Sequence, residues 1–122
     1  MKFAEDNQKE GYVITAYDST NIVINGKSFT QSLIIAGEQM NDSWGVDSIS
    51  TLTNEHVDTI LSFKPELILI GTGRSLTFPA VDAYAPIISA GIGVDFMDTG
   101  AACRTYNILM GEGRGVVAGL IL

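Results

Sequence analysis

The sequence predicts an α/β fold, and the clearest reason lies between Leu67 and Asn107. This region holds two short apolar runs, which read LILIGTG and GVDFMDTG. Each run ends in a turn that contains Gly, or Asp and Thr, and a helix-like segment follows each turn. Strands that alternate with helices in this way form sheets whose strand-to-helix turns collect at one edge and commonly hold ligands.

Length and composition indicate a compact globular protein. The chain has 122 residues, of which 46% are hydrophobic and only three are proline, so we expect one folded domain over residues 1–122 rather than a disordered chain. The net charge is −7, which argues against binding to a nucleic-acid backbone. All three arginines lie after residue 63, in the half that contains the two turns.

Cysteine usage and the polar start of the chain predict a cytoplasmic location. Cys103 is the single cysteine, so no internal disulfide can form, as is usual in a reducing compartment. The start, MKFAEDNQKEG, lacks the pattern of a signal or transit peptide. No apolar run approaches the length of a membrane span, so we expect no membrane association. With one histidine and one cysteine, we expect no metal site and no cofactor.

The first third of the chain reads as a β-meander. After a loose lead-in over residues 1–11, the β-branched and aromatic content predicts strands at residues 12–17, 21–24 and 27–36. Asn25-Gly26 separates the last two, and such a pair favours a hairpin because both residues tolerate positive φ. Residues 37–50 read as a polar connection. Within it, Trp44 is interpreted as a lid over the core edge, with an exposed anchor for a partner as the alternative.

Helices and buried strands alternate through the rest of the chain. Thr53 is a candidate N-cap, and the apolar spacing after it predicts a helix that Pro65 ends. Pro79 lies near the start of a second helix, in which Val81, Tyr84, Ala85 and Ile88 share one face and Pro86 either bends or interrupts the helix. Asp98 or Thr99 caps a third helix. The predicted helices span residues 54–63, about 79–91 and 100–110; the predicted strands span residues 66–71, 94–97 and 116–122, with the chain ending inside the last strand.

With these segments in place, the chain resembles a known family over nearly its whole length. The resemblance is to the domain of unknown function 498 family (DUF498), also called the Mth938-like fold family. The run MDTGAACRTYNIL is long and unusual, which makes the match specific. The matching residues are Ile24-Asn25-Gly26, Trp44, Leu52-Thr53, Lys64-Pro65-Glu66, Gly71-Thr72-Gly73, Phe78-Pro79, Met97-Asp98-Thr99, Ala102, Arg104-Thr105-Tyr106-Asn107 and Glu112-Gly113-Arg114.

The resemblance implies a small three-layer α/β sandwich with a mixed central sheet and no established catalytic activity. One family member is a mitochondrial respiratory complex I assembly factor, which implies an assembly or scaffolding role through an unidentified protein partner. Nothing in this sequence indicates a complex I partner or a mitochondrial address. We therefore expect a protein that is not an enzyme and has no catalytic residues.

The two turns are the candidate ligand site. Gly71-Thr72-Gly73 lets the backbone approach a ligand closely, and Arg74 offers charge-assisted hydrogen bonds to an anion. Asp98 and Thr99 open a helix whose first amides favour an anion, and Arg104 lies one turn further on. If the two strands are parallel neighbours, both turns face one edge, and the alternative function is binding or conversion of a small anionic ligand. In the competing interpretation the glycines serve tight turns and the arginines pair with Asp95, Asp98 or Glu112.

Other chemistry is weaker. Cys103 lies early in a helix, where the dipole lowers a thiol pKa, but a nucleophile needs a base and His56 lies on a different helix. We interpret Cys103 as a small buried thiol and His56 as a surface or capping residue. Tyr106 and Asn107 are expected to satisfy backbone groups around the turns.

Overall fold

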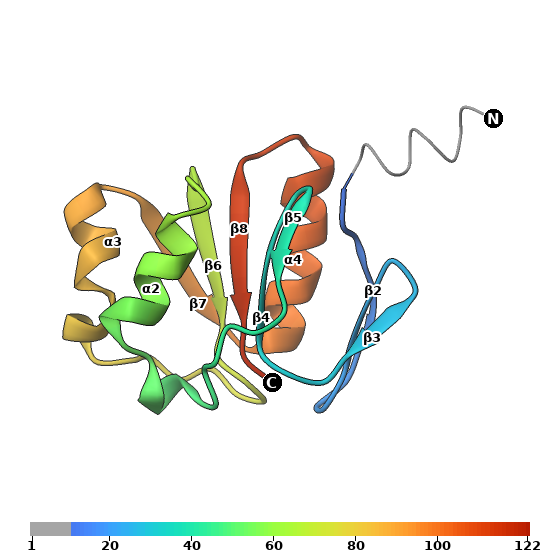
Figure 1. The fold of residues 1–122 in the computed structure, drawn as a ribbon, viewed down its shortest axis with the longest axis horizontal. Helices are drawn as coiled ribbons and strands as arrows, with labels where there is room; N and C mark the ends of the chain where they lie inside the picture. Colours follow the sequence, from blue (N-terminus) through green and yellow to red (C-terminus); the bar gives the residue numbers. More distant parts are fainter. Residues whose placement is uncertain (1–10) are drawn as a thin grey trace.

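A computed structural model describes residues 11–122, so the predicted lead-in lies outside the described residues except for Gly11. The strands form two sheets (Figure 1). The small sheet has the order β1-β2-β3 and the large sheet the order β5-β4-β8-β6-β7. The strands are β1 (Ile14–Tyr17), β2 (Ile22–Ile24), β3 (Lys27–Phe29), β4 (Leu33–Ala36), β5 (Gln39–Asn41), β6 (Leu67–Gly71), β7 (Gly93–Met97) and β8 (Val116–Leu120).

The small sheet is the predicted meander, with both strand pairs antiparallel. Asn25 and Gly26 turn the β2–β3 hairpin with φ of 49° and 84°, the left-handed conformation that this pair adopts at low cost. The single strand predicted over residues 27–36 is wrong, because it is two strands in different sheets. β3 is mostly exposed whereas the Leu33–Ile35 run is buried on both faces, and only a central position in the large sheet buries both faces of a strand.

The large sheet is mixed, as expected from the resemblance. β6 pairs in parallel with β7 on one side and with β8 on the other. β4 runs antiparallel to β8 and to the short β5. The prediction missed β5 because it lies in the polar connection, where its side chains are exposed or half-buried. An edge strand of this kind carries little apolar signal.

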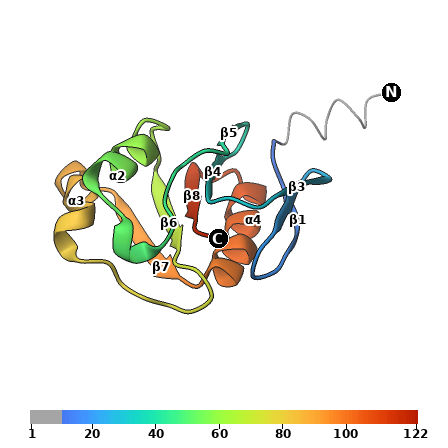
Figure 2. The same ribbon diagram turned by 60° about the horizontal axis from the view of Figure 1, so that its bottom comes forward.

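Helices cover both faces of the large sheet (Figures 1 and 2). α2 (Asn54–Leu61) and α3 (Ala85–Ala90) lie on one face and α4 (Thr99–Gly111) lies on the other. Together they give the predicted three-layer α/β arrangement, and the small sheet packs beside α4. No helix within residues 11–122 combines the length and the apolar character needed to cross a membrane.

The second predicted helix differs most from the structure. Residues 79–91 hold a 3-10 helix, η2 (Val81–Tyr84), followed by the six-residue α3. Pro86 lies in the first turn of α3, where a missing amide hydrogen costs nothing. The break changes the helical phase, so Ile87 is buried whereas Ile88 is 55% exposed. The inward face predicted from unbroken helical spacing is therefore wrong.

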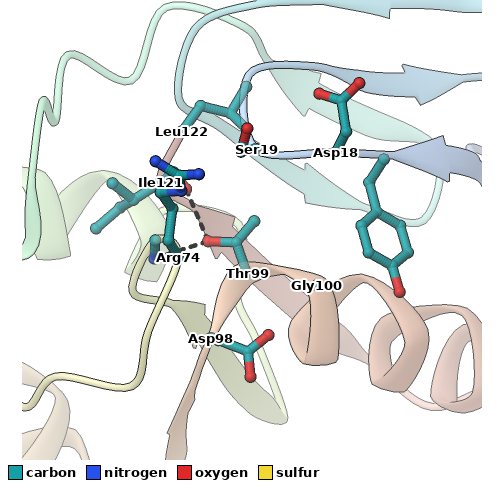
Figure 3. Close-up of a pocket in the computed structure, with 10 residues that line it drawn as sticks. Asp18, Ser19, Arg74, Asp98, Thr99, Gly100, Ile121 and Leu122 are labelled. Carbon is teal, nitrogen blue, oxygen red and sulfur yellow. Dashed lines mark hydrogen bonds between the residues drawn. The ribbon is translucent and has the colours of Figure 1, made fainter.

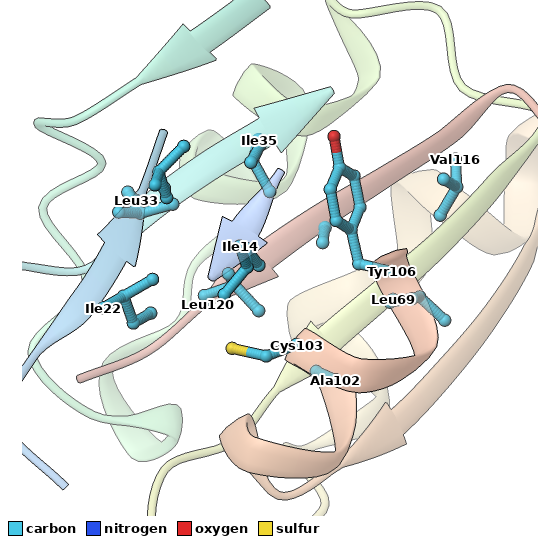
Figure 4. Close-up of a cluster of buried hydrophobic side chains, with 12 residues drawn as sticks. Ile14, Ile22, Leu33, Ile35, Leu69, Ala102, Cys103, Tyr106, Val116 and Leu120 are labelled. Carbon is cyan, nitrogen blue, oxygen red and sulfur yellow. The ribbon is translucent and has the colours of Figure 1, made fainter. Parts of the chain in front are cut away.

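Alternating residues of the large sheet supply two cores. The core on the α4 side combines sheet residues such as Leu33, Leu69 and Leu120 with the buried side chains of α4 (Figure 4). The core on the α2–α3 side takes the intervening residues, such as Ile34, Ile68 and Val117. Apolar residues at every position of the central strands follow from burial on both faces.

Trp44 is a lid over the second core, as interpreted from the sequence. Its side chain is 5% exposed, and its indole Nε1 donates a hydrogen bond to the His56 carbonyl at 3.0 Å. The ring lies over Gly119 of β8, where an added Cβ would stand 2.6 Å from the indole. Gly119 therefore leaves the space that the indole ring fills.

Candidate functional site

The candidate site lies where the three parallel strands of the large sheet end. β6 ends at Gly71, β7 at Met97 and β8 at Leu120, and the paired register places these ends side by side. The connection after β6 leads to α3 on one face, and the connection after β7 leads to α4 on the other. Neighbouring strands whose connections leave on opposite faces create the crevice where open α/β sheets bind ligands.

The two predicted turns are hydrogen-bonded to each other. The Thr72 amide donates to the Met97 carbonyl at 2.8 Å, and the Thr99 amide donates to the Gly73 carbonyl at 2.8 Å. The buried Thr99 hydroxyl accepts from the Gly73 amide at 2.9 Å and donates to the Ile121 carbonyl at 2.7 Å. One side chain thus joins the ends of all three strands.

Gly71 is required by close packing rather than by ligand approach. A Cβ at this position would lie 2.9 Å from both the Cα and the Oγ1 of Thr99, and 3.2 Å from the Ala102 Cβ. The absence of a side chain lets the first turn of α4 rest on the strand end. Gly71 therefore serves the packing of α4 against the strand end.

Asp98 caps α4 and competes with any anion there. Its Oδ1 accepts a hydrogen bond from the Ala101 amide at 2.9 Å, which satisfies one of the free amides of the first turn. A second negative group at the same helix end would meet the carboxylate. The amides that favoured an anion in the sequence analysis already have an internal acceptor.

A cavity of about 290 Å³ opens beside the two turns. Four of the predicted site residues line it, namely Gly73, Arg74, Asp98 and Thr99, whereas Gly71, Thr72 and Arg104 do not. The sequence analysis missed the lining residues from the β1–β2 turn and from the segment after β8, because no spacing along the chain links these segments to the two predicted turns. The lining residues besides those four are Tyr17, Asp18, Ser19, Gly100, Ile121 and Leu122.

Arg74 and Asp98 occupy separate parts of the cavity wall. In Figure 3 the Asp98 carboxylate points away from the Arg74 guanidinium, and Asp18 lies on the side of the small sheet. The cavity therefore presents one positive and two negative side chains. Of these three side chains, the sequence analysis identified Arg74 and Asp98 but not Asp18.

Arg104 acts on the cavity through Tyr17. Its guanidinium donates a hydrogen bond to the Tyr17 hydroxyl and lies 5.9 Å from the ring centroid, within cation–π range. A Cβ on Gly100 would stand 2.9 Å from the same ring. Within residues 11–122 the hydrogen-bond partner of Arg104 is thus Tyr17 and not one of the three acids considered in the sequence analysis.

Cys103 is a buried thiol, as interpreted from the sequence. It is fully buried in the core on the α4 side, and burial raises the pKa of its thiol from 9.0 to about 12, although Arg104 acts in the opposite direction. His56 belongs to α2 on the other face, and its Nδ1 accepts from the Thr53 amide at 3.0 Å as part of a capping box. The fold therefore separates these two residues instead of pairing them. Among residues 11–122 no group of three or more potential metal ligands is found.

Tyr106 and Asn107 connect α4 to the start of the small sheet. The Tyr106 hydroxyl accepts from the Gly37 amide at 3.0 Å and donates to the Tyr12 carbonyl at 3.2 Å. The Asn107 amide bonds both backbone groups of Ile14, at 3.0 and 2.6 Å. Both side chains satisfy backbone groups, as predicted, but these groups lie at Tyr12 and Ile14 near the first strand and at Gly37 between β4 and β5, not at the two strand-end turns.

Known proteins share this fold and sequence. The chain is 32% identical to a protein named "13 kDa major membrane protein" from Francisella tularensis, over 95% of both chains. It is 29% identical to NADH dehydrogenase [ubiquinone] 1 alpha subcomplex assembly factor 3 from Bos taurus. The matched region covers 88% of this chain but 59% of that protein. A solution structure of a Mth938-like domain from Bordetella pertussis has a TM-score of 0.78 and 30% identity, and covers 90% of this chain and 85% of that one.

A family model supports the same assignment from the sequence side. The model for proteins of unknown function DUF498/DUF598 matches residues 14–121. This range runs from the first strand to the residue after the last one, so it contains both sheets and the cavity. The chain therefore belongs to the DUF498/DUF598 family.

Proposed function

We propose that this protein acts by binding a protein partner, in an assembly-type role without catalysis, through an exposed apolar segment at residues 76–81. The observation that carries the proposal is the exposure of three large apolar side chains within six residues. Leu76 is 51% exposed, Phe78 68% and Val81 60%. Clustered exposed apolar groups of this kind mark interaction surfaces more often than single ones do.

The segment is ordered by contacts beneath it. The Phe78 ring meets Phe96 of β7 edge-on, with centroids 5.8 Å apart, and the Tyr84 ring makes a second edge-on contact with Phe96, with centroids 4.9 Å apart. Asn54 of α2 donates to the carbonyls of Asp82 and Ala83 at 2.8 and 3.0 Å. A preformed aromatic surface binds at a low cost in conformational entropy.

The charges around the 76–81 segment indicate which kind of partner surface would bind it. Asp82 is exposed directly after Val81, and the net charge of the protein is −7. Arg74, two residues before Leu76, is the basic residue nearest to the segment in the chain. We therefore infer a partner that presents an apolar patch flanked by lysine or arginine.

The relatives support a protein partner. The bovine relative is named as an assembly factor, and this chain corresponds to 59% of its length, so a shared role would reside in the shared domain. We also propose a cytoplasmic site of action, as the sequence predicts. A buried free thiol at Cys103 is compatible with a reducing compartment.

The test compares a double variant of the proposed surface with a single variant at an exposed apolar side chain elsewhere. Phe78→Ser with Val81→Ser removes the proposed surface, and Ile108→Ser removes a 61% exposed side chain on α4. Proteins cross-linked to each form in cells are identified by mass spectrometry, and the best candidate is purified and titrated. We expect at least a tenfold loss of affinity in the double variant and none in Ile108→Ser. Equal affinity of all three forms would refute the proposal.

A further inference from the structure

We propose that the cavity at the ends of β6, β7 and β8 binds a small zwitterion, a molecule with one carboxylate, one ammonium and an apolar side chain, such as an apolar α-amino acid. This site lies apart from the 76–81 segment: none of the residues of that segment lines the cavity. The inference therefore goes beyond the proposed protein binding. It also replaces the small anion of the sequence analysis with a ligand of different charge.

The charges of the wall select the ligand class. The guanidinium of Arg74 offers parallel donors to a carboxylate, and Asp18 and Asp98 offer acceptors to an ammonium. A plain anion of the predicted kind gains one favourable charge and meets two like charges, and a plain cation meets the guanidinium. A molecule with both groups is attracted by all three side chains.

The two carboxylates are held in place with one oxygen to spare. Asp18 Oδ1 accepts from the Thr20 amide at 2.9 Å and from its hydroxyl at 3.2 Å, and Asp98 Oδ1 accepts from the Ala101 amide at 2.9 Å. In the part of the chain that the structure describes, the hydrogen bonds of both groups engage Oδ1 alone. Each carboxylate is thus oriented by its own turn and keeps Oδ2 as an acceptor for a ligand.

The rest of the wall is mainly apolar and the cavity is small. Besides Ser19 and Thr99, the wall includes Tyr17, Ile121 and Leu122, and the volume of about 290 Å³ is at the lower end for ligand pockets. Arg104 holds the Tyr17 ring from outside, and Gly100 leaves the space that this ring occupies. Arg104 is therefore a positioning residue for the apolar wall, which suits a ligand of amino-acid size.

The test uses three probes that differ in charge alone. L-leucine, 4-methylpentanoate and 3-methylbutylamine share one apolar tail. Leucine carries both charged groups, 4-methylpentanoate carries only the carboxylate, and 3-methylbutylamine carries only the ammonium. Each is titrated calorimetrically into the whole protein at neutral pH, with L-alanine and L-phenylalanine added to vary the tail. We expect binding of at least one amino acid, with both single-charge analogues of leucine at least tenfold weaker than leucine. Absence of binding by all three amino acids would overturn the proposal, as would equal binding of 4-methylpentanoate and leucine, which would restore the plain anion.

Variants assign the binding to the cavity. Arg74→Gln and Asp18→Asn each remove one charge from exposed side chains, so both are expected to fold and to weaken amino-acid binding at least tenfold. Asp95→Asn removes an exposed charge that is outside the cavity lining and serves as the matched control. Arg74→Gln is further expected to narrow the difference in affinity between leucine and 3-methylbutylamine, because the guanidinium attracts the leucine carboxylate and repels the amine. Binding that survives both cavity variants would place the ligand elsewhere and overturn the assignment.

Discussion

The two faces of the large sheet are equally apolar but are covered to different extents. On one face, the thirteen-residue α4 buries Ala102, Cys103 and Tyr106 completely, and the small sheet packs beside it. On the other face, α2 buries Val57 and Ile60, whereas α3 has six residues, follows a 3-10 turn and buries Ile87 alone. Exposed apolar side chains remain around it, at Phe78, Val81 and Ile88.

The composition of the sheet does not explain why one face leaves more apolar side chains exposed. Successive residues of β6, such as Leu69 and Ile70, point to opposite faces and are both buried. What differs is the continuity of the cover, which is one thirteen-residue helix on one face and α2 with the short α3 on the other. The continuously covered face, which we call the closed face, also supplies one wall of the cavity, and the other, less covered face carries the segment that we propose binds a partner.

The most severe test of the closed face is Gly71→Ala. The added Cβ meets backbone atoms of Thr99, which cannot move without lifting α4 from the sheet, so we expect a loss of about 3 kcal/mol in the free energy of unfolding. Urea unfolding measures it. Gly111→Ala is the control, because nothing lies within 4 Å of a Cβ there, and it should leave stability unchanged or raise it by up to about 1 kcal/mol. Equal stability of the two variants would show that the contact at Gly71 is not tight.

Thr99→Val tests the hydrogen bonds at the end of the closed face. The substitution keeps the shape but removes the hydroxyl that accepts from Gly73 and donates to Ile121. Two buried groups lose their partner, so we expect a loss of about 2 kcal/mol, with Thr99→Ser close to the wild type. Thermal unfolding beside Thr59→Val, whose hydroxyl bonds a helix carbonyl near the surface, provides the comparison. A smaller effect at Thr99 than at Thr59 would contradict the role of Thr99 as the junction of the strand ends.

Alkaline pH is expected to weaken the closed face selectively. Burial raises the pKa of the Tyr106 hydroxyl from 10.0 to about 12, with the Gly37 hydrogen bond acting in the opposite direction, and burial raises the Cys103 pKa to about 12. The folded protein then holds protons that the unfolded chain releases, so this stabilising contribution is complete below about pH 9 and is lost as pH rises towards 12. Urea unfolding from about pH 8 to about pH 11 should show a decline of roughly 4 kcal/mol in the free energy of unfolding. Tyr106→Phe should flatten the upper part of this decline, and an unchanged slope in that variant would exclude Tyr106 as its cause.

The smallest effect on stability is expected on the less covered face. Phe78 is 68% exposed and touches the fold through an edge-on contact with Phe96, so Phe78→Ser should cost less than about 1 kcal/mol. Thermal unfolding measures this cost, with Ile87→Ala as the buried counterpart on the same face, where we expect about 3 kcal/mol. A loss at Phe78 as large as that at Ile87 would make Phe78 a core residue and remove the reason for assigning it to a partner.

Much of the element order is predictable from local sequence. The Asn25-Gly26 hairpin, the Thr53 cap, the buried run of β6 and the Asp98 cap of α4 each rest on residues that are neighbours in the chain. The errors lie where distant segments decide the outcome. β4 leaves the meander because β8 offers a buried partner strand, and the α3 region depends on a phase change between two short helices.

The candidate site divides in the same way. The sequence analysis expected both turns at one edge of the sheet if their strands were parallel neighbours, and β6 and β7 do pair in parallel. The presence of Asp18 and Tyr17 at that edge depends on how the small sheet packs beside α4, which no local pattern encodes. The separation of Cys103 from His56 by the sheet has the same origin.

The α/β class, the family, the two strand-end turns and the presence of Arg74 and Asp98 at them can be predicted from the sequence, because they depend on short-range periodicity, capping and motif residues. The structure is needed to show that the two turns bond each other, that Asp18 adds a second negative charge to the cavity, and that Phe78 stays exposed. Hydrogen-bond partners, local electrostatics and burial depend on which distant segments pack together, and chain neighbours alone do not specify that.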